Sequence, residues 1–429
     1  MKSVSQTIVI AIVLTILAGC ICPSGNRPPG LSVQSDKERI TSPDVPASDQ
    51  AELVGGNSAF AFDLYHLLKE EKEGNLFYSP YSISLALAMT YAGARSETER
   101  QMADTLHYTL PQDRLHPAFN WLDLEIASRG KGAKSKDGQG FQLNIANTLW
   151  GQQGYAFLPG FLDTLAINYG AGMQLVDFVG DPEAARVAIN DWVSDETADR
   201  IKDLIPPGVI DELTRLVLTN AIYFNAAWAE PFDESLTQDG PFTLLDGSQV
   251  SVPMMRQTTS FGYAEGSGYQ AVELPYDGRD LSMVILLPAE DTFESFENSL
   301  DSERVNAILD NLLYGEVALT MPKFELESDF SLVEALKEMG MPVAFSIDAD
   351  FSGMDGTQDM LIGEVLHKAF VSVDEAGTEA AAATAVEIQL ESAPMQVFVV
   401  TVDRPFIFLI RDIETGSILF VGRVVNPSP

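Results

Sequence analysis

The chain has 429 residues, 46% of them hydrophobic, so it is long enough for one large domain or two ordinary ones around a sizeable core. Its 62 acidic and 26 basic residues give a net charge of −36. This charge argues against a nucleic-acid partner, whose phosphates would be repelled, and we interpret it as a soluble surface adapted to a salty or crowded medium.

The first 20 residues have the pattern of a targeting segment. Lys2 is a short basic start, and residues 8–18 are an apolar run that is too short for a bilayer, which needs about 20 residues. The following Leu17-Ala18-Gly19-Cys20 resembles the lipobox of prokaryotic lipoproteins. We therefore expect a signal peptide over residues 1–19, lipid on Cys20, and an exported protein anchored to a membrane at the cell surface. An ordinary secretory signal is the alternative.

Residues 20–50 are predicted to be a disordered tether. The stretch 23–50 holds five prolines and five serines and no aromatic residue, a composition that cannot build a packed core. A flexible coil of this length spans roughly 30 Å, enough to hold a domain away from a membrane. Cys22 is the only cysteine besides Cys20, so the rest of the chain has no disulfide.

Hydrophobic periodicity predicts an α+β chain with helices concentrated early and strands late. The early elements are helices at 52–70, 82–92, 111–128 and 182–198, a break at 75–80, and strands at 141–150 and 216–224. The later elements are short strands at 242–245, 250–255, 269–274, 281–287 and 317–324, helices at 293–313 and 330–339, and a loop at 351–355.

The stretch from Val371 to Leu390 alternates in a way that predicts a strand with one buried face. Every second residue from Thr378 to Leu390 is small and then apolar, while the other face begins and ends with acidic residues. Alanines at 380–383 favour helix by propensity, so an edge strand and an alanine-rich surface helix are both open on pattern alone. Firmer strands at 371–374 and 396–402 leave a convertible segment between two fixed ones.

Longer motifs at both ends of the chain carry a family resemblance. The motifs are NLFYSPYSISLALAMTYAGA at 75–94, HKAF at 367–370, VDEAGTEAAAAT at 373–384 and the long signature at 402–427. They resemble the serpins, a family of protease inhibitors. The resemblance implies one domain over residues 51–429, with three sheets, about nine helices and an exposed reactive loop at about 375–396. It also implies a hinge in that loop, made of Glu375, Gly377, Thr378, Glu379, Ala380, Ala381, Ala382 and Ala383.

Two further sets of residues follow from the resemblance alone. The first is a hydrogen-bonded shutter under the main sheet, comprising Ser79, Ser82, Asn220 and His367. The second is the scissile bond, which the family spacing from Glu375 places at Glu391–Ser392; a slip of one residue would make it Leu390–Glu391.

The activity implied by the resemblance is suicide inhibition of a serine, or a cysteine, endopeptidase. The protease attacks the loop and is trapped as an acyl-enzyme when the loop inserts into the central sheet. A non-inhibitory binding or chaperone member is the alternative, but such members tend to carry proline or charge on the inward face of the hinge, and this hinge has neither. Ala376 and Arg404 depart from the family pattern without altering that face.

Enzymatic activity finds little support in the sequence. There is no G-x-S-x-G, H-E-x-x-H, P-loop or G-x-G-x-x-G motif, and the four histidines have no metal-ligand spacing. We expect no cofactor and no metal, and a monomer whose partner is the target endopeptidase. The loop carrying Lys131, Lys134 and Lys136 lies where serpins can bind polyanions, but three charges on so acidic a chain are more typical of a solvated loop.

Overall fold

The computed structural model describes residues 31–130, 142–197, 199–378 and 396–428. These residues form ten α-helices, two short 3-10 helices (Glu234–Leu236 and Pro342–Phe345) and sixteen strands. The α-helices are α1 (Ala47–Glu71), α2 (Pro80–Tyr91), α3 (Ser96–Thr105), α4 (Gln112–Ser128), α5 (Pro159–Tyr169), α6 (Pro182–Glu196), α7 (Phe293–Glu297), α8 (Ser302–Asp310), α9 (Val333–Met339) and α10 (Ser352–Asp355).

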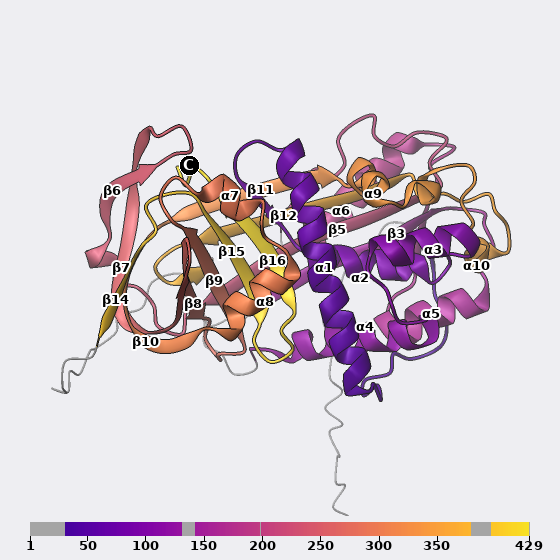
Figure 1. The fold of residues 1–429 in the computed structure, drawn as a ribbon. Coiled ribbons are helices and arrows are strands. Elements are labelled where there is room, and N and C mark those ends of the chain that lie inside the picture. The colour runs from indigo at the N-terminus through magenta and orange to yellow at the C-terminus, as the bar shows by residue number, and fades with distance from the viewer. Residues whose placement is uncertain (1–30, 131–141, 198, 379–395, 429) are drawn as a thin grey trace, which may run out of the picture.

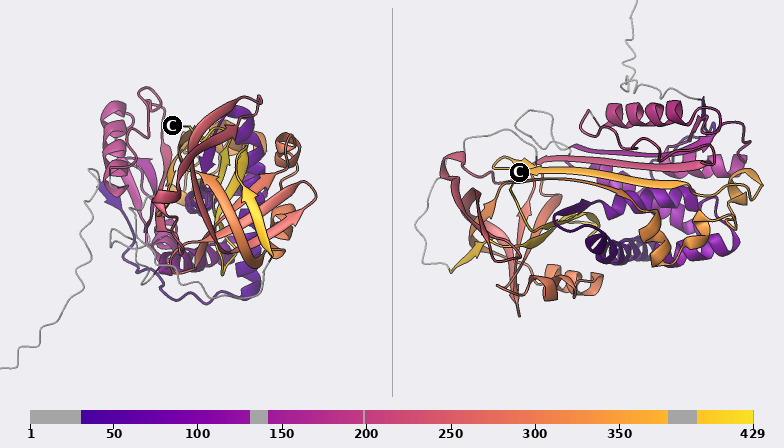
Figure 2. Two further views of the ribbon diagram at one scale, coloured as in Figure 1. Left: turned by 90° about the vertical axis from the view of Figure 1, so that its left-hand side faces the viewer. Right: turned by 90° about the horizontal axis from the view of Figure 1, so that it is seen from above.

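A seven-stranded sheet runs through the centre of the molecule (Figure 1). Its spatial order is β1 (Leu31–Val33), β4 (Met173–Val176), β3 (Gln142–Gln152), β5 (Leu216–Ala227), β13 (Gly377–Thr378), β12 (Glu364–Val373) and β11 (Phe324–Ser331). Strands β5 and β12 are parallel and also bond directly to each other. Helix α6 covers one face of this sheet, and α1, α2 and α4 lie on the other, as the view from above shows (Figure 2).

The remaining strands form one nine-stranded sheet rather than the two further sheets that we expected. Its order is β14 (Val397–Thr401), β10 (Leu313–Pro322), β7 (Gln249–Gly266), β8 (Tyr269–Pro275), β9 (Leu281–Pro288), β15 (Phe406–Asp412), β16 (Ile418–Val424) and β2 (Leu76–Tyr78), with β6 (Gln238–Thr243) paired to β7. The long strand β7 pairs with β6 in its first part, β10 in its middle and β8 at its end, and so joins two parts into one ladder.

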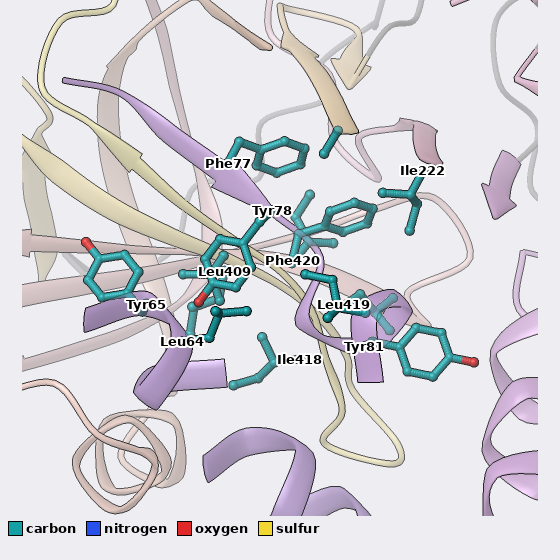
Figure 3. Packing of buried hydrophobic residues seen from close by; sticks show 14 of the residues in the cluster. Leu64, Tyr65, Phe77, Tyr78, Tyr81, Ile222, Leu409, Ile418, Leu419 and Phe420 are labelled. Carbon is teal, nitrogen blue, oxygen red and sulfur yellow. The ribbon is translucent and has the colours of Figure 1, made fainter. Parts of the chain in front are cut away.

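The hydrophobic core joins the two sheets. The ring of Phe420 in β16 stacks on Phe77 in β2, with centroids 5.1 Å apart, and lies 5.5 Å from Phe224 in β5. Figure 3 shows Leu64 and Tyr65 of α1 gathered around the same strands. Because every residue of α2 is buried, that helix forms part of the core and not a surface layer.

The disordered tether predicted for residues 20–50 is wrong for its second half. Residues 31–33 form β1, which pairs antiparallel with β4, and α1 already begins at Ala47. Between them the Arg39 guanidinium bonds Asn120 and Asp123 of α4, and the Ile40 amide donates to the Ile167 carbonyl of α5 at 3.0 Å. The polar groups of this segment find partners far away in the sequence, which composition alone does not reveal.

Four local predictions also change. The break at 75–80 contains β2, and the helix predicted at 293–313 divides into α7 and α8, because the Asp301 carboxylate caps a new helix by accepting from the Arg304 amide at 2.8 Å. Leu313, the last residue of the predicted helix, is the first residue of β10. Strand β11 continues to Ser331, so α9 begins later than predicted, and the loop at 351–355 contains the single turn α10.

Candidate functional site at the hinge of the loop

The first part of the predicted reactive loop already lies inside the central sheet. Gly377 and Thr378 form β13, which pairs antiparallel with Ala226 and Ala227 at the end of β5 and with Val373 at the end of β12. Further down, β5 and β12 pair directly, from Glu364 opposite Val217 to Phe370 opposite Tyr223. The hinge therefore stands at the point where two bonded strands part.

The exposed loop expected from residue 375 onwards is thus corrected at its beginning. Glu375, Ala376 and Thr378 are all buried, and Ala376 packs against Ala227. The Trp228 amide donates to the Ala376 carbonyl and the Phe232 amide to the Glu375 carbonyl, at 2.9 and 2.8 Å. The chain enters the sheet here because its backbone groups find partners on the segment that follows β5.

Thr378 is held by aromatic residues that the sequence did not single out. Its side-chain hydroxyl shares a 2.9 Å hydrogen bond with the Tyr276 hydroxyl, and the ring of Tyr276 stacks on Trp228 with centroids 4.7 Å apart. The Trp228 indole N–H donates to the Asp374 carbonyl. We call Trp228, Tyr276, Glu375 and Thr378 the hinge cluster; it fully buries a small polar side chain and leaves its hydroxyl paired.

Gly377 is required by a close approach. A Cβ atom at this position would lie 2.2 Å from the Ala226 carbonyl oxygen and 2.6 Å from the Ala227 Cα, both backbone atoms that cannot move aside. Any larger residue would therefore force β13 away from β5.

The carboxylates beside the hinge differ in their electrostatics. Burial raises the pKa of Asp374, although its Oδ1 accepts from the Ala376 and Gly377 amides. Burial also acts to raise the pKa of Glu375, but hydrogen bonds from the Lys323 ammonium and the Thr237 hydroxyl, both at 2.7 Å, hold it below its ordinary value. Glu375 is thus an ionised anchor at the base of the loop.

The structure brings the four residues of the predicted shutter into one hydrogen-bonded cluster. Asn220 and His367 are register partners across β5 and β12, while Ser79 and Ser82 lie at the start of α2 beneath them. The Asn220 amide donates to the Ser82 hydroxyl, and the Ser79 hydroxyl donates to the Leu419 carbonyl at 2.7 Å. The Ser79 oxygen also accepts from the Ser82 amide as the cap of α2.

The tautomer of His367 follows from its neighbours. Its Nε2 accepts from the Ser79 amide at 3.2 Å, so the proton of the neutral ring lies on Nδ1 and is donated to the Asn220 side-chain oxygen. Burial lowers the pKa of His367 to about 3. The ring is therefore neutral and bridges β12, β5 and α2 at neutral pH.

Asn147 is a fifth member of this cluster that the sequence reasoning missed. It lies opposite Asn220 in β3, and its side-chain oxygen accepts from the Asn220 amide and the Ser82 hydroxyl. Its signal was a polar residue on the otherwise apolar face of the strand, formed with Leu143, Ile145 and Leu149. We call these five residues the shutter cluster: Ser79, Ser82, Asn147, Asn220 and His367.

Several predicted site residues lie outside the described residues. These are Cys20, the lysines at 131, 134 and 136, the hinge residues from Glu379 to Ala383, and both candidate scissile bonds. Within the described ranges, no group of three or more His, Cys, Asp or Glu side chains has metal-binding geometry. No helix of those ranges is long and apolar enough to cross a bilayer.

Comparison with known proteins defines the class to which this fold and hinge belong. Residues 55–427 match the family model described as "Serpin (serine protease inhibitor)", and the chain belongs to the serpin family. An uncharacterised serpin-like protein of Thermococcus kodakarensis is 40% identical over 98% of both chains. The leukocyte elastase inhibitor of Sus scrofa is 42% identical over 88% of this chain and all of its own.

A solved structure agrees with this assignment. The thermophilic serpin tengpin in its native state is 27% identical, with a TM-score of 0.79 over 92% of this chain and 97% of its own. The α+β serpin fold expected from the sequence is confirmed by the family match and by this structural similarity.

Proposed function

We propose that this protein is a suicide inhibitor of serine endopeptidases, which traps its target as an acyl-enzyme by inserting its reactive loop into the central sheet. The observation that carries the proposal is the position of Thr378, bonded between β5 and β12 where the two strands part. A loop that begins between the ends of β5 and β12 becomes a full strand if its following residues extend the same pairing along these two strands.

The chemistry of the following residues supports continued insertion. From Thr378 the inward positions are alanine, alanine and threonine, followed by Val386, Ile388 and Leu390. Burying each of the last three contributes about 1.5–3 kcal/mol, and each new backbone hydrogen bond a net of about 0.5–1.5 kcal/mol. The sum exceeds about 10 kcal/mol, which is comparable to the stability of a whole domain. The native state is therefore metastable towards insertion.

The direct test is covalent trapping. The purified protein is mixed with glutamyl endopeptidase, chymotrypsin or pancreatic elastase, and complexes are separated on denaturing gels. We expect a complex that survives SDS for at least one enzyme, with loss of that enzyme's activity. Cleavage of the loop without any such complex would show a substrate and would favour the non-inhibitory alternative.

The specificity proposal concerns the scissile bond. Counting from Glu375 with the family spacing places it at Glu391–Ser392, and the small hydroxyl residue after the bond supports this register. The target would then be a glutamate-preferring serine protease, or a cysteine protease that selects acidic residues. Mass spectrometry of the released C-terminal fragment tests the register. A fragment that starts at Ser392 supports it, whereas one that starts at Glu391 selects Leu390 and a chymotrypsin- or elastase-like target.

The location proposal concerns the N-terminus. We propose export and lipid anchoring through Cys20, on the pattern of the apolar run and the lipobox. Cys20→Ser should release the protein from membranes without affecting inhibition, because Cys20 precedes every element in the part of the chain that the structure describes. The measurement is membrane fractionation, and continued membrane association of the variant would contradict the anchor.

The working unit is proposed to be a monomer, because the hinge and shutter clusters are both complete within one chain. Light scattering of the purified, lipid-free protein tests this. A stable dimer that loses inhibition on dilution would contradict it.

A further inference from the structure

One face of β14 and of its neighbour β10 has exposed apolar side chains and no net charge. In β14 and β10, residues that pair across the ladder share a face, which places Val397 and Val399 beside Glu316 and Ala318. Two residues earlier in β10, Tyr314 points to the same side. Tyr314, Val397 and Val399 are 61%, 43% and 64% exposed.

The neighbouring strand β7 continues this face with short polar side chains. Ser260, Thr258 and Arg256 pair with Glu316, Ala318 and Thr320 of β10, and all three β7 residues are exposed. We call this surface the β14 face, comprising Tyr314, Glu316, Ala318, Thr320, Val397, Val399, Thr401, Arg256, Thr258 and Ser260.

The β14 face differs from the rest of the chain in two ways. Its single acidic and single basic residue cancel, whereas the whole chain carries −36. In addition, three of the twelve large hydrophobic residues that are exposed among the described residues lie on this face: Tyr314, Val397 and Val399. Such a concentration of apolar side chains without net charge is typical of a surface that meets another protein.

The position of the face identifies the partner. Strand β14 begins at Val397, five residues after the proposed scissile bond, and five residues span about 18 Å at most when fully extended. A protease domain of about 220 residues has a radius of gyration of about 17 Å. An enzyme with its active site on that bond therefore has its body over β14 and β10, which lie together at one end of the molecule (Figure 1).

We propose that the β14 face is a docking surface for the body of the target endopeptidase, which meets it with an uncharged, partly apolar surface beside its active-site cleft and a carboxylate opposite Arg256. This inference rests on the proposed inhibitory function. Docking raises the rate at which the enzyme engages the loop and takes no part in insertion, so it selects among proteases that accept the same scissile bond.

The test uses the full chain and two surface variants, Val399→Glu and Tyr314→Ser, with Ile347→Glu as the matched control. Ile347 is 89% exposed and lies between α9 and α10, which are at the opposite end of the molecule from β14 and β10 (Figure 1). The second-order rate constant of inhibition is measured with whichever of glutamyl endopeptidase, chymotrypsin and pancreatic elastase forms a complex. The number of inhibitor molecules consumed per enzyme trapped, and cleavage of a synthetic peptide with the loop sequence, are measured in parallel.

We expect the Val399→Glu rate constant to fall about fivefold or more, because a charge then meets an apolar surface, and Tyr314→Ser to lower it less. The Ile347→Glu rate, the inhibitor consumed per enzyme and the peptide cleavage should not change. Wild-type rates for both surface variants would overturn the docking surface and leave the proposed function intact. A wild-type protein that traps no enzyme would overturn both. A concentration-dependent dimer that Val399→Glu abolishes, with inhibition unaffected, would assign the face to a second copy and also overturn the inference.

Discussion

The hinge cluster and the shutter cluster hold the same two strands, β5 and β12, in opposite ways. At the shutter the strands bond directly, and His367 and Asn220 tie them to each other and to β3 and α2. At the hinge they are parted by β13, and the side chain of Thr378 makes one hydrogen bond, to the Tyr276 hydroxyl. A side-chain network therefore holds β5 and β12 together in the middle of the sheet, whereas β13 separates them at its end. Separation of these two strands thus has a defined starting point at the hinge.

The largest expected effect comes from separating β5 and β12 along their whole length, at the shutter cluster as well as at the hinge. If cleavage lets the loop insert between β5 and β12 past the shutter cluster, as proposed, the thermal midpoint should rise by about 12 °C or more, given a gain above about 10 kcal/mol in a domain of about 380 residues. Calorimetry before and after limited proteolysis measures this. An unchanged midpoint would falsify strand insertion.

The next effect is specific to the hinge. Thr378→Arg places a charge where a fully buried hydroxyl stands, which should displace β13 from between β5 and β12. On the proposed mechanism, insertion then loses its starting point and the protein becomes a substrate, with at least about a tenfold loss of trapped enzyme. Thr378→Ser retains the hydroxyl for Tyr276 and is the matched control. The measurement is partitioning between complex and cleaved inhibitor on a gel. Equal trapping by the arginine variant would mean that β13 is not the starting point of insertion.

A smaller effect is expected at the shutter. Asn220→Ala removes the partner of His367 Nδ1–H and of the Ser82 and Asn147 oxygens, and should lower the free energy of unfolding by about 3 kcal/mol. Asn225→Ala is the control in the same strand, because its amide makes one longer bond, of 3.3 Å, and its oxygen has no partner among the described residues. Urea unfolding gives both values. Equal losses in the two variants would show that the network has no special role.

The smallest effect is a pH dependence assigned to His367. Its pKa is about 3 in the folded protein and about 6.5 when unfolded, so between these values the unfolded chain binds a proton that the native state does not. The contribution of neutral His367 to the free energy of unfolding is complete above pH 6.5 and decreases by up to about 1.4 kcal/mol for each pH unit below it. Burial also lowers the pKa of His116, to about 4, so His116 makes a second contribution to the decrease of stability with falling pH.

The variant His367→Gln should remove the His367 contribution to this pH dependence and leave that of His116. Unfolding free energies at pH 7, 6 and 5 for wild type and variant measure the difference between them, in which the carboxylates common to both cancel. If the two curves run parallel, His367 is protonated in the native state or is not buried there.

The sequence predicted much of this arrangement where a pattern was local or the family motif was long. The strands predicted at 141–150 and 216–224 and the helix predicted at 82–92 lie within a few residues of β3, β5 and α2, because hydrophobic patterns are local. The family motifs named the four shutter residues that the structure brings into one cluster. The prediction of a disordered tether was wrong beyond residue 30, and the sequence did not identify Asn147 as part of the shutter cluster or Trp228 and Tyr276 as part of the hinge cluster. Their roles come from partners more than 60 residues away, to which neither composition nor periodicity refers.

By itself the sequence determined the family, the α+β composition and a loop whose inward face has no bulky or charged residue before Val386. Only the tertiary structure decided that the loop begins inside the sheet, with Thr378 between β5 and β12, and that Glu375 is an ionised anchor beside Lys323. The physical reason is that strand pairing and the pKa of a buried carboxylate depend on which distant groups lie within about 3 Å, and those distances are set by the packed fold and not by neighbours in the chain.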